Sequence, residues 1–340
     1  MTVMIAPDAN DKSIISLSNG DKMPQLGLGT WKSKPGEVEA AVKSAIDAGY
    51  RHIDCAYAYG NECEVGNAIA DKIADGSVKR EDVWVTGKLW NTFHRKQFVE
   101  EAVKCSLRDL QLEYLDLFLI HWPVDFKCSW TPGEQICFDA RKAFPKLETG
   151  KMELDEVDLT ETWEALEACV DKGLLRNIGL SNFNEKQIEQ VHTTARVKPT
   201  VLQVECHPFL QQAELLKFCA AKEIAVTAYS PLGGSTNDKP ENSPTPLADP
   251  VVQEIAATHG KNAGQVCIKW CLQRGVIAVP KSVSPSRIAG NADMSGWALT
   301  EADMAKLAEL ERGFRSCVPQ VMVDGKSLPR DADHRDYPFA

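Results

Sequence analysis

Short runs rich in Val, Ile, Leu and Tyr alternate along the chain with longer stretches whose apolar residues recur at helical spacing. We predict strands near residues 26–29, 52–54, 83–87, 114–120, 175–180, 201–205, 224–229 and 276–280. Helices are predicted after Pro35, at roughly 62–73, 95–110, 160–172, 185–195, 212–222 and 264–274, and from near Pro285. Eight such repeats without a compositional break favour one closed α/β barrel, a (β/α)8 TIM barrel domain over residues 1–340, rather than two domains.

Three regions interrupt this alternation, and a fourth precedes it. An Asn-Gly pair at positions 19 and 20 predicts an N-terminal hairpin over residues 13–23. Long connections over residues 123–158 and 232–250 follow strand ends, and loops of that length in a compact domain are usually binding loops. The tail, residues 313–340, looks irregular, but its aromatic end predicts that it docks onto the barrel.

The charge balance limits the classes of partner. The 340 residues include 38 Lys and Arg against 48 Asp and Glu, a net charge of −10, which disfavours binding to nucleic acid or to an anionic membrane surface. Any anionic ligand then needs a local cationic pocket. The eleven cysteines form no CxxC pair, and no apolar signal segment or membrane span is evident. We therefore expect a cytoplasmic protein with reduced thiols.

Polar side chains follow four of the predicted strands. Asp54 and Tyr59 follow the second strand, Lys88 the third and His121 the fourth, while Lys281 follows the last. The carboxyl ends of parallel barrel strands open on one face, so these groups are expected to converge there.

These residue types fit the reduction of a carbonyl group. Hydride adds to carbon, negative charge grows on oxygen, and a proton must be delivered to that oxygen. A phenol such as Tyr59 is a weak acid at neutral pH, but the ammonium of Lys88 is expected to lower its pKa, with Asp54 holding the ammonium in place. His121 is expected to orient the substrate oxygen. Taken singly, each residue has an ordinary structural explanation, so the prediction depends on their joint placement.

Two sequence features bear on phosphate binding. Gly27-Leu-Gly29-Thr-Trp-Lys32 begins like a dinucleotide fingerprint, but Lys32 stands where the third glycine is required, so we reject a Rossmann site. Near Pro285, a strand end leads into a helix that carries Lys281 and Arg287 close to its start. That arrangement predicts an anion site, with a solvated helix start as the alternative.

Motifs along essentially the whole chain resemble the aldo-keto reductase superfamily. They are Gly49-Tyr-Arg-His-Ile-Asp54, Tyr59-Gly-Asn-Glu62, Lys88-Leu-Trp, Ile120-His121-Trp-Pro, Gly179-Leu-Ser181-Asn182-Phe, Gln203-Val-Glu-Cys-His-Pro, Tyr229-Ser230-Pro-Leu-Gly and Val279-Pro-Lys281-Ser282. Within the superfamily, the tail from Val323 looks most like the NADPH-dependent aldehyde reductases, the glucuronate-reducing branch, with aldose reductase next.

The resemblance implies roles residue by residue. Tyr59 would be the general acid, Lys88 and Asp54 its tuning pair, and His121 the group that orients the carbonyl. NADPH would transfer its 4-pro-R hydride. Its binding residues would be Gly29, Thr30, Trp31, Asp54, Ser181, Asn182, Gln203, Tyr229, Ser230, Leu232, Lys281, Ser282, Val283, Arg287 and Asn291. Among these, Lys281, Ser282 and Arg287 match the family's 2′-phosphate clamp.

The resemblance also implies an apolar substrate slot and a preference for acidic aldehydes. The slot would be formed by Trp31, Tyr59, Trp90, His121, Trp122 and Phe126. Arg315 in the tail would bind a substrate carboxylate such as that of a uronate or a keto-sugar acid, the alternative being an arginine exposed to water. We expect a monomer acting on small aldehydes.

Three departures from the family pattern bear on affinity. Gly290 stands where related reductases often contact adenine, the loop after Gly233-Gly234 lacks the usual tryptophan, and residues 127–158 differ in detail. Three alternative functions remain. They are an aldose reductase-like reductase of neutral sugars, a non-catalytic NADPH-binding barrel such as a channel subunit or crystallin, and a metal-dependent hydrolase. The seven histidines show no metal-binding spacing, so no metal is expected.

Overall fold

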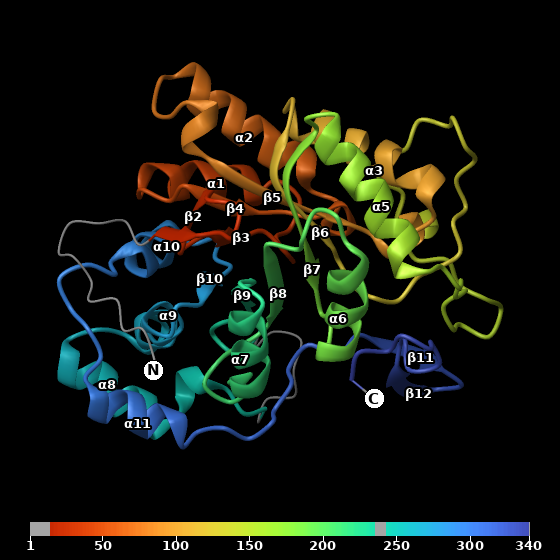
Figure 1. Cartoon of the computed structure of the whole chain (residues 1–340). Helices are drawn as coiled ribbons and strands as arrows, with labels where there is room; N and C mark the ends of the chain where they lie inside the picture. Colours follow the sequence, from red (N-terminus) through yellow and green to blue (C-terminus); the bar gives the residue numbers. More distant parts are fainter. Residues whose placement is uncertain (1–13, 235–242, 340) are drawn as a thin grey trace.

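The computed structural model describes residues 14–234 and 243–339, and its centre is a sheet of eight parallel strands (Figure 1). The strands are β3 (Leu28–Gly29), β4 (His52–Asp54), β5 (Trp84–Leu89), β6 (Leu115–Ile120), β7 (Leu175–Ser181), β8 (Val201–Glu205), β9 (Ala225–Tyr229) and β10 (Ile277–Val279). They lie side by side in chain order, each pairing with the next.

The first and last strands close the sheet into a barrel. Isolated parallel bridges join Leu26 to Ala278 and Gly29 to Lys281. At Gly29 the backbones approach so closely that a Cβ atom there would lie 2.8 Å from the carbonyl oxygen of Val279. A glycine is therefore required at the point of closure, and the predicted (β/α)8 architecture is confirmed.

Helices surround the barrel, as the apolar periodicity predicts. Those at the predicted places are α1 (Val38–Asp47), α2 (Glu62–Ala74), α3 (Lys96–Leu110), α5 (Leu159–Asp171), α6 (Glu185–Thr194), α7 (Ala213–Ala221), α9 (Ala263–Gln273) and α10 (Pro285–Ala292). Several begin with a side-chain cap: Asn184 and Asn262 each form a capping box at the start of their helix. Their apolar faces pack into the main core.

Some elements were not predicted. They are helices α4 (Ala140–Ala143), α8 (Pro250–His259) and α11 (Glu301–Ala308), the hairpin strands β11 (Gln320–Val323) and β12 (Lys326–Pro329), and the 3-10 turns η1 (Tyr57–Tyr59), η2 (Arg80–Asp82), η3 (Asn91–Phe93) and η4 (Pro246–Ala248). The prediction of an irregular tail is therefore wrong for residues 320–329, where four residue pairs form an antiparallel ladder. Figure 1 shows this hairpin near the C-terminus.

The N-terminal hairpin is confirmed and closes the amino end of the barrel. Strand β1 (Ile14–Ser16) pairs with β2 (Lys22–Pro24) in antiparallel register. Leu17 and Met23 of this unit are buried in one small cluster with side chains from the starts and interiors of the barrel strands, namely Trp84, Leu117, Leu119, Val201 and Ile277. The opposite end, where the strands finish, is therefore the end left for a site.

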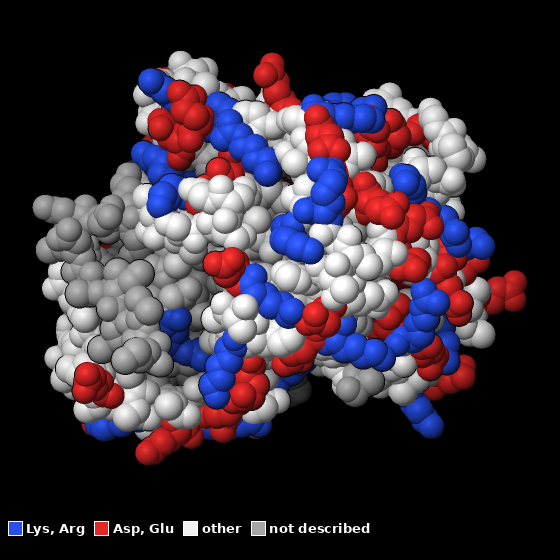
Figure 2. Space-filling model, viewed as in Figure 1, with Lys and Arg blue, Asp and Glu red and all other residues white. Residues whose placement is uncertain are grey.

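Charged side chains of both signs lie on the surface of the molecule (Figure 2). Lys, Arg, Asp and Glu intermingle over the face seen in Figure 2, and no single-sign patch dominates it. Within residues 14–234 and 243–339, every helix is too short or too polar to cross a bilayer.

Candidate active site

The carboxyl ends of β4, β5 and β6 bring four predicted residues together. Asp54 ends β4, Tyr59 ends the 3-10 turn that follows it, Lys88 lies in β5, and His121 directly follows β6. The Lys88 Nζ atom donates hydrogen bonds to Asp54 Oδ1 at 2.6 Å, to the Cys55 carbonyl at 2.8 Å and to Tyr59 Oη at 3.3 Å. The predicted convergence of these side chains is confirmed by the coordinates.

Lys88 and Asp54 form a buried ion pair, with 1% and 3% of their surfaces exposed. The second carboxylate oxygen of Asp54 accepts a hydrogen bond from Gln203 Nε2 at 2.7 Å. A buried charge pair is tolerated only when its remaining hydrogen-bonding groups are satisfied, as they are here. The ammonium is consequently fixed in position beside the phenol of Tyr59.

The imidazole of His121 packs edge-on against Tyr59, with 5.7 Å between ring centroids, and against Trp90, at 5.2 Å. Burial lowers the pKa of His121 well below its usual range, and the charges of Lys88 and Arg330 lower it further. Its Nδ1 atom is enclosed and has no hydrogen-bond partner among the described residues. His121 is therefore a neutral imidazole at physiological pH.

The pKa of Tyr59 differs from the sequence prediction. Burial raises it well above the usual value, and the nearby Asp54 carboxylate raises it further. The predicted lowering by Lys88 is therefore wrong for this structure, because desolvation of the phenolate, which a sequence does not reveal, outweighs the ammonium. Tyr59 carries its proton at neutral pH, as a proton donor must.

A second set of predicted residues lies beside the first, at the ends of β7, β8 and β9. Asn182 adopts a left-handed conformation, with φ of 64°, and its amide nitrogen donates to the His121 carbonyl and to Ser181 Oγ. Tyr229 Oη donates to Asn182 Oδ1 at 2.8 Å. These amide groups therefore have protein partners, and a carboxamide ligand would have to replace some of them.

The loop after β3 borders the same site. Thr30 is buried and its hydroxyl donates to the Asp54 carbonyl at 2.8 Å. Trp31 is 41% exposed, and its ring centroid lies 6.3 Å from that of Tyr59. The exposed indole therefore stands beside the phenol and is available to a ligand.

The predicted anion site lies where β10 leads into α10. Lys281 and Arg287 are exposed, and within the described chain neither forms an ion pair with a carboxylate. Burial lowers the pKa of Lys281, and Arg287 lowers it further, against the opposing effect of Glu37. Two cations that disfavour each other, next to the Ser282 hydroxyl and a helix N-terminus, fit a phosphate group. Val283 lies between them, partly buried.

Asn291 of α10 and Leu232 after β9, both predicted to bind the cofactor, lie close to α9. A Cβ atom on Gly264 would lie 3.7 Å from Asn291 Oδ1 and 3.8 Å from Leu232 Cδ2, so these two side chains flank one space. A Cβ atom on Gly290 would lie 4.0 Å from the amide nitrogen of the Asn262 side chain. Ser230 begins the connection with a left-handed φ of 48°. The loop that lacks the family tryptophan continues into residues 235–242, which lie outside the described residues.

Most of the side chains predicted to form the aromatic wall are buried. Trp90 is 3% exposed, Trp122 6% and Phe126 1%, so Phe126 supports Trp90 from behind, at 5.9 Å between ring centroids. The indole nitrogen of Trp90 donates to the Ala143 carbonyl at 2.6 Å. The long connection over residues 123–158 thus helps to fix this wall.

Two tail arginines reach the site region, and only one was predicted. The Arg315 guanidinium lies 3.9 Å from the Phe339 ring centroid and lines a hollow of about 150 Å³ with Asn182. Arg330 was missed: it lies 5.0 Å from the ring centroid of Phe126 and 5.7 Å from that of Trp90, and its charge acts on His121. Arg330 is part of the tail motif that begins at Val323, but nothing in the sequence indicated which arginine turns inward.

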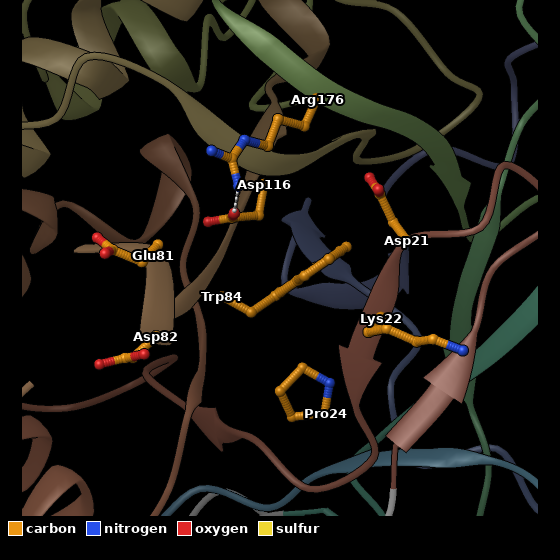
Figure 3. A pocket seen from close by; sticks show the side chains of 8 residues that line it. All are labelled: Asp21, Lys22, Pro24, Glu81, Asp82, Trp84, Asp116 and Arg176. Atoms are coloured by element: carbon orange, nitrogen blue, oxygen red, sulfur yellow. Dashed lines mark hydrogen bonds and ion pairs between the residues drawn. The ribbon is translucent and has the colours of Figure 1, made fainter. Parts of the chain in front are cut away.

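A separate hollow of about 140 Å³ lies at the amino end of the barrel, beneath the N-terminal hairpin (Figure 3). Asp116 there is paired with Arg80 at 2.7 Å and with Arg176 at 3.5 Å, and Asp21 of the hairpin turn accepts a hydrogen bond from Asn177, so these charged groups already have protein partners. Across the described ranges no group of three or more His, Cys, Asp or Glu is arranged to hold a metal ion.

Comparison with known proteins agrees with this geometry. The family model "Aldo/keto reductase family" matches residues 25–312. The chain is 48% identical to aldo-keto reductase family 1 member A1 of Mus musculus and 47% identical to that of Homo sapiens, in each case covering 96% of this chain and 98% of the relative.

Among solved structures, the aldose reductase of Schistosoma japonicum is similar with a TM-score of 0.85 at 39% identity, covering 96% of this chain and 98% of that one. The fold, the clustered side chains and the extent of these matches lead to one assignment. The chain belongs to the aldo/keto reductase family and is an NADPH-dependent oxidoreductase that reduces carbonyl groups.

Proposed function

We propose that the chain reduces aldehydes to alcohols by 4-pro-R hydride transfer from NADPH, and that aldehydes bearing a carboxylate are its preferred substrates. The observation that carries the proposal is the Lys88 ammonium held between Asp54 and Tyr59, with the neutral imidazole of His121 packed against the same phenol. NADPH supplies the hydride when it is bound.

The chain's own residues handle the proton and the developing charge. The neutral imidazole of His121 directs the carbonyl oxygen toward Tyr59, because an uncharged ring can donate one hydrogen bond without competing for the proton. As negative charge grows on that oxygen, Tyr59 Oη releases its proton to it. The Lys88 ammonium, 3.3 Å away, stabilises the phenolate that remains.

We propose that the cofactor residues implied by the family resemblance bind NADPH in this chain. Lys281, Ser282 and Arg287 would hold the 2′-phosphate, while Ser181, Asn182 and Gln203 would face the nicotinamide carboxamide and Tyr229 its ring. Gly29, Thr30, Trp31, Ser230, Leu232, Val283 and Asn291 would line the rest of the channel. We also propose a cytoplasmic monomer in which the whole chain acts as one domain.

Tyr59→Phe tests the proton donor. The variant keeps the ring that packs against His121 and Trp31 but lacks the hydroxyl, so we expect turnover to fall by about a hundredfold to ten-thousandfold. NADPH binding, measured by the quenching of tryptophan fluorescence, should change little. Retained turnover would remove Tyr59 from this role and would favour a different acid.

The proposed preference for acidic aldehydes rests on cationic tail residues near an apolar wall. Arg330 is the stronger candidate for the substrate carboxylate, since its guanidinium lies over Phe126 and its charge acts on His121. The Asp331 carboxylate already accepts two hydrogen bonds of 2.6 Å from the Arg330 guanidinium, so it would compete with a substrate carboxylate. Arg315 lies over Phe339, farther along the tail, and remains the second candidate.

A comparison of kcat/KM for glucuronate and for a neutral aldose separates these possibilities. Loss of a charge-assisted contact should lower the ratio by about tenfold or more in Arg330→Ala, with Arg315→Ala as the matched variant. If Arg315→Ala alone lowers the ratio, the assignment belongs to Arg315. An unchanged ratio in both would favour an aldose reductase-like preference for neutral sugars.

A further inference from the structure

Glu62 is a buried carboxyl group at the start of the helix that follows Tyr59, and the reaction described above does not use it. It is the first residue of α2, three positions after Tyr59, and only 4% of its surface is exposed. Its Oε2 atom accepts a hydrogen bond from Ser106 Oγ of α3 at 3.0 Å. Its Oε1 atom is enclosed and has no hydrogen-bond partner among the described residues.

This environment favours the neutral acid over the carboxylate. A buried carboxylate is stable only when several donors or a cation contact it, and here a single hydroxyl donates to one of the two oxygens. Burial raises the pKa of Glu62 to about 8; the Ser106 hydrogen bond and the charge of Lys88 act in the opposite direction, and Asp109 adds to the rise. Glu62 therefore changes charge just above neutral pH.

The carboxyl group is also coupled to the reacting residues. The residue before it, Asn61, donates to the Thr30 carbonyl at 3.0 Å, and Thr30 in turn donates to the Asp54 carbonyl. The start of α2 is thereby tied to the end of β4. A negative charge on Glu62 raises the pKa of Tyr59 and that of the neighbouring Cys55.

We propose that Glu62 is a positioning residue for carbonyl reduction: held as a neutral acid, it keeps Tyr59 an effective proton donor, and its ionisation slows proton delivery to the substrate oxygen. The inference rests on the proposed function, because it concerns the same proton. No atom of Glu62 needs to touch the substrate. Its effect is electrostatic and acts through Tyr59 and Lys88.

Other charged and titratable groups surround Glu62. Asp54 of β4, Lys88 of β5 and Asp109 of α3 act through their charges on Glu62 or on Tyr59. Burial raises the pKa of Cys55 and that of Cys105 well above the pH range in which Glu62 titrates, and burial raises that of Cys63 as well. Tyr59 itself titrates far higher.

The test compares wild type with Glu62→Gln, which keeps the shape and the bond to Ser106 but cannot ionise. With saturating NADPH and an aromatic aldehyde, kcat of wild type should fall by roughly threefold or more as pH rises through about 8, since a new buried charge weakens the acid. In Glu62→Gln that fall should be absent. An identical fall in the variant would overturn the proposal.

Two controls exclude a purely structural role. Ser106→Ala removes a contact that lowers the Glu62 pKa, so the fall should move to higher pH rather than vanish. Glu64→Gln changes a less buried carboxyl two positions along the same helix and should leave the profile unchanged. A profile altered by Glu64→Gln would count against a specific effect of Glu62.

Thermal unfolding without substrate separates failure of the inference from failure of the function. Unfolded Glu62 loses its proton near its ordinary pKa while the folded form retains it, so wild type loses stability between about pH 5 and 8 relative to Glu62→Gln. The Tm difference should therefore grow across this range. If the Tm difference grows with pH but wild type reduces no carbonyl, the proposed function is wrong. If wild-type turnover is normal but the Tm difference does not change with pH, the inference about Glu62 is wrong.

Discussion

Replacing Lys88 by Met tests the arrangement on which the proposed chemistry depends. The substitution leaves a flexible apolar side chain in a fully buried position and removes the bonds to Asp54, Cys55 and Tyr59. Two effects are expected: loss of turnover, because the phenolate has no cation beside it, and loss of stability, because the Asp54 carboxylate stays buried without its partner.

The magnitudes follow from the contacts. Breaking one side of a buried ion pair costs about 3–5 kcal/mol, and the lower end applies because Gln203 still donates to Asp54. An unfolding entropy of about 2 cal/mol/K per residue over the chain turns about 3 kcal/mol into a fall in Tm of about 4 °C. Turnover should fall by about a hundredfold to ten-thousandfold.

The double variant Asp54→Asn with Lys88→Met separates these two effects. Without the carboxylate there is no unpaired charge, so Tm should recover most of its loss while turnover stays absent. Thermal unfolding and aldehyde-dependent loss of NADPH absorbance measure the two quantities. If Lys88→Met retains both Tm and turnover, the buried cation has neither role and the reasoning fails.

Three other predictions concern separate parts of the molecule. Lys281→Ala with Arg287→Ala should raise KM for NADPH at least tenfold more than KM for NADH, since only NADPH carries the 2′-phosphate; equal rises would contradict the clamp. Gly29→Ala should lower the free energy of unfolding, measured by denaturant titration, by about 1–3 kcal/mol, because its Cβ atom would lie 2.8 Å from the Val279 carbonyl oxygen. Gly20→Ala in the hairpin turn is the control: its Cβ atom would meet no neighbouring atom, so this variant measures only the cost of a positive φ. Because the pKa of His121 is lowered well below about 6.5, kcat/KM should show no inflection near that pH, and an inflection that disappears in His121→Gln would refute the neutral imidazole.

Much of the site could be predicted because its parts follow strand ends. Asp54, Lys88 and His121 each come within a residue or two of a short apolar run, and a parallel barrel leaves only one face for them. Helix α11 could also have been found, since Thr300 and Asp303 form a capping box that is visible in the sequence.

Other features depend on tertiary contacts that no local pattern encodes. All four residues of β12 are exposed, so apolar alternation gave no indication of the tail hairpin, and the inward position of Arg330 depends on how that hairpin docks. Likewise, the connection that holds Trp90 through Ala143 is irregular in sequence. Arg330, whose guanidinium lies over Phe126, is the tail residue that sequence reasoning missed.

The sign of the Tyr59 pKa shift shows why residue types alone are insufficient for mechanism. An ammonium at 3.3 Å favours the phenolate, whereas burial and Asp54 favour the phenol, and the second pair prevails. Tyr59 can still donate its proton despite the raised pKa, because the nascent alkoxide is a far stronger base than any phenolate. Lys88 then acts on the product of proton transfer, the phenolate, rather than by ionising Tyr59 beforehand. The ammonium lowers the energy of the transition state while the free protein keeps the proton in place.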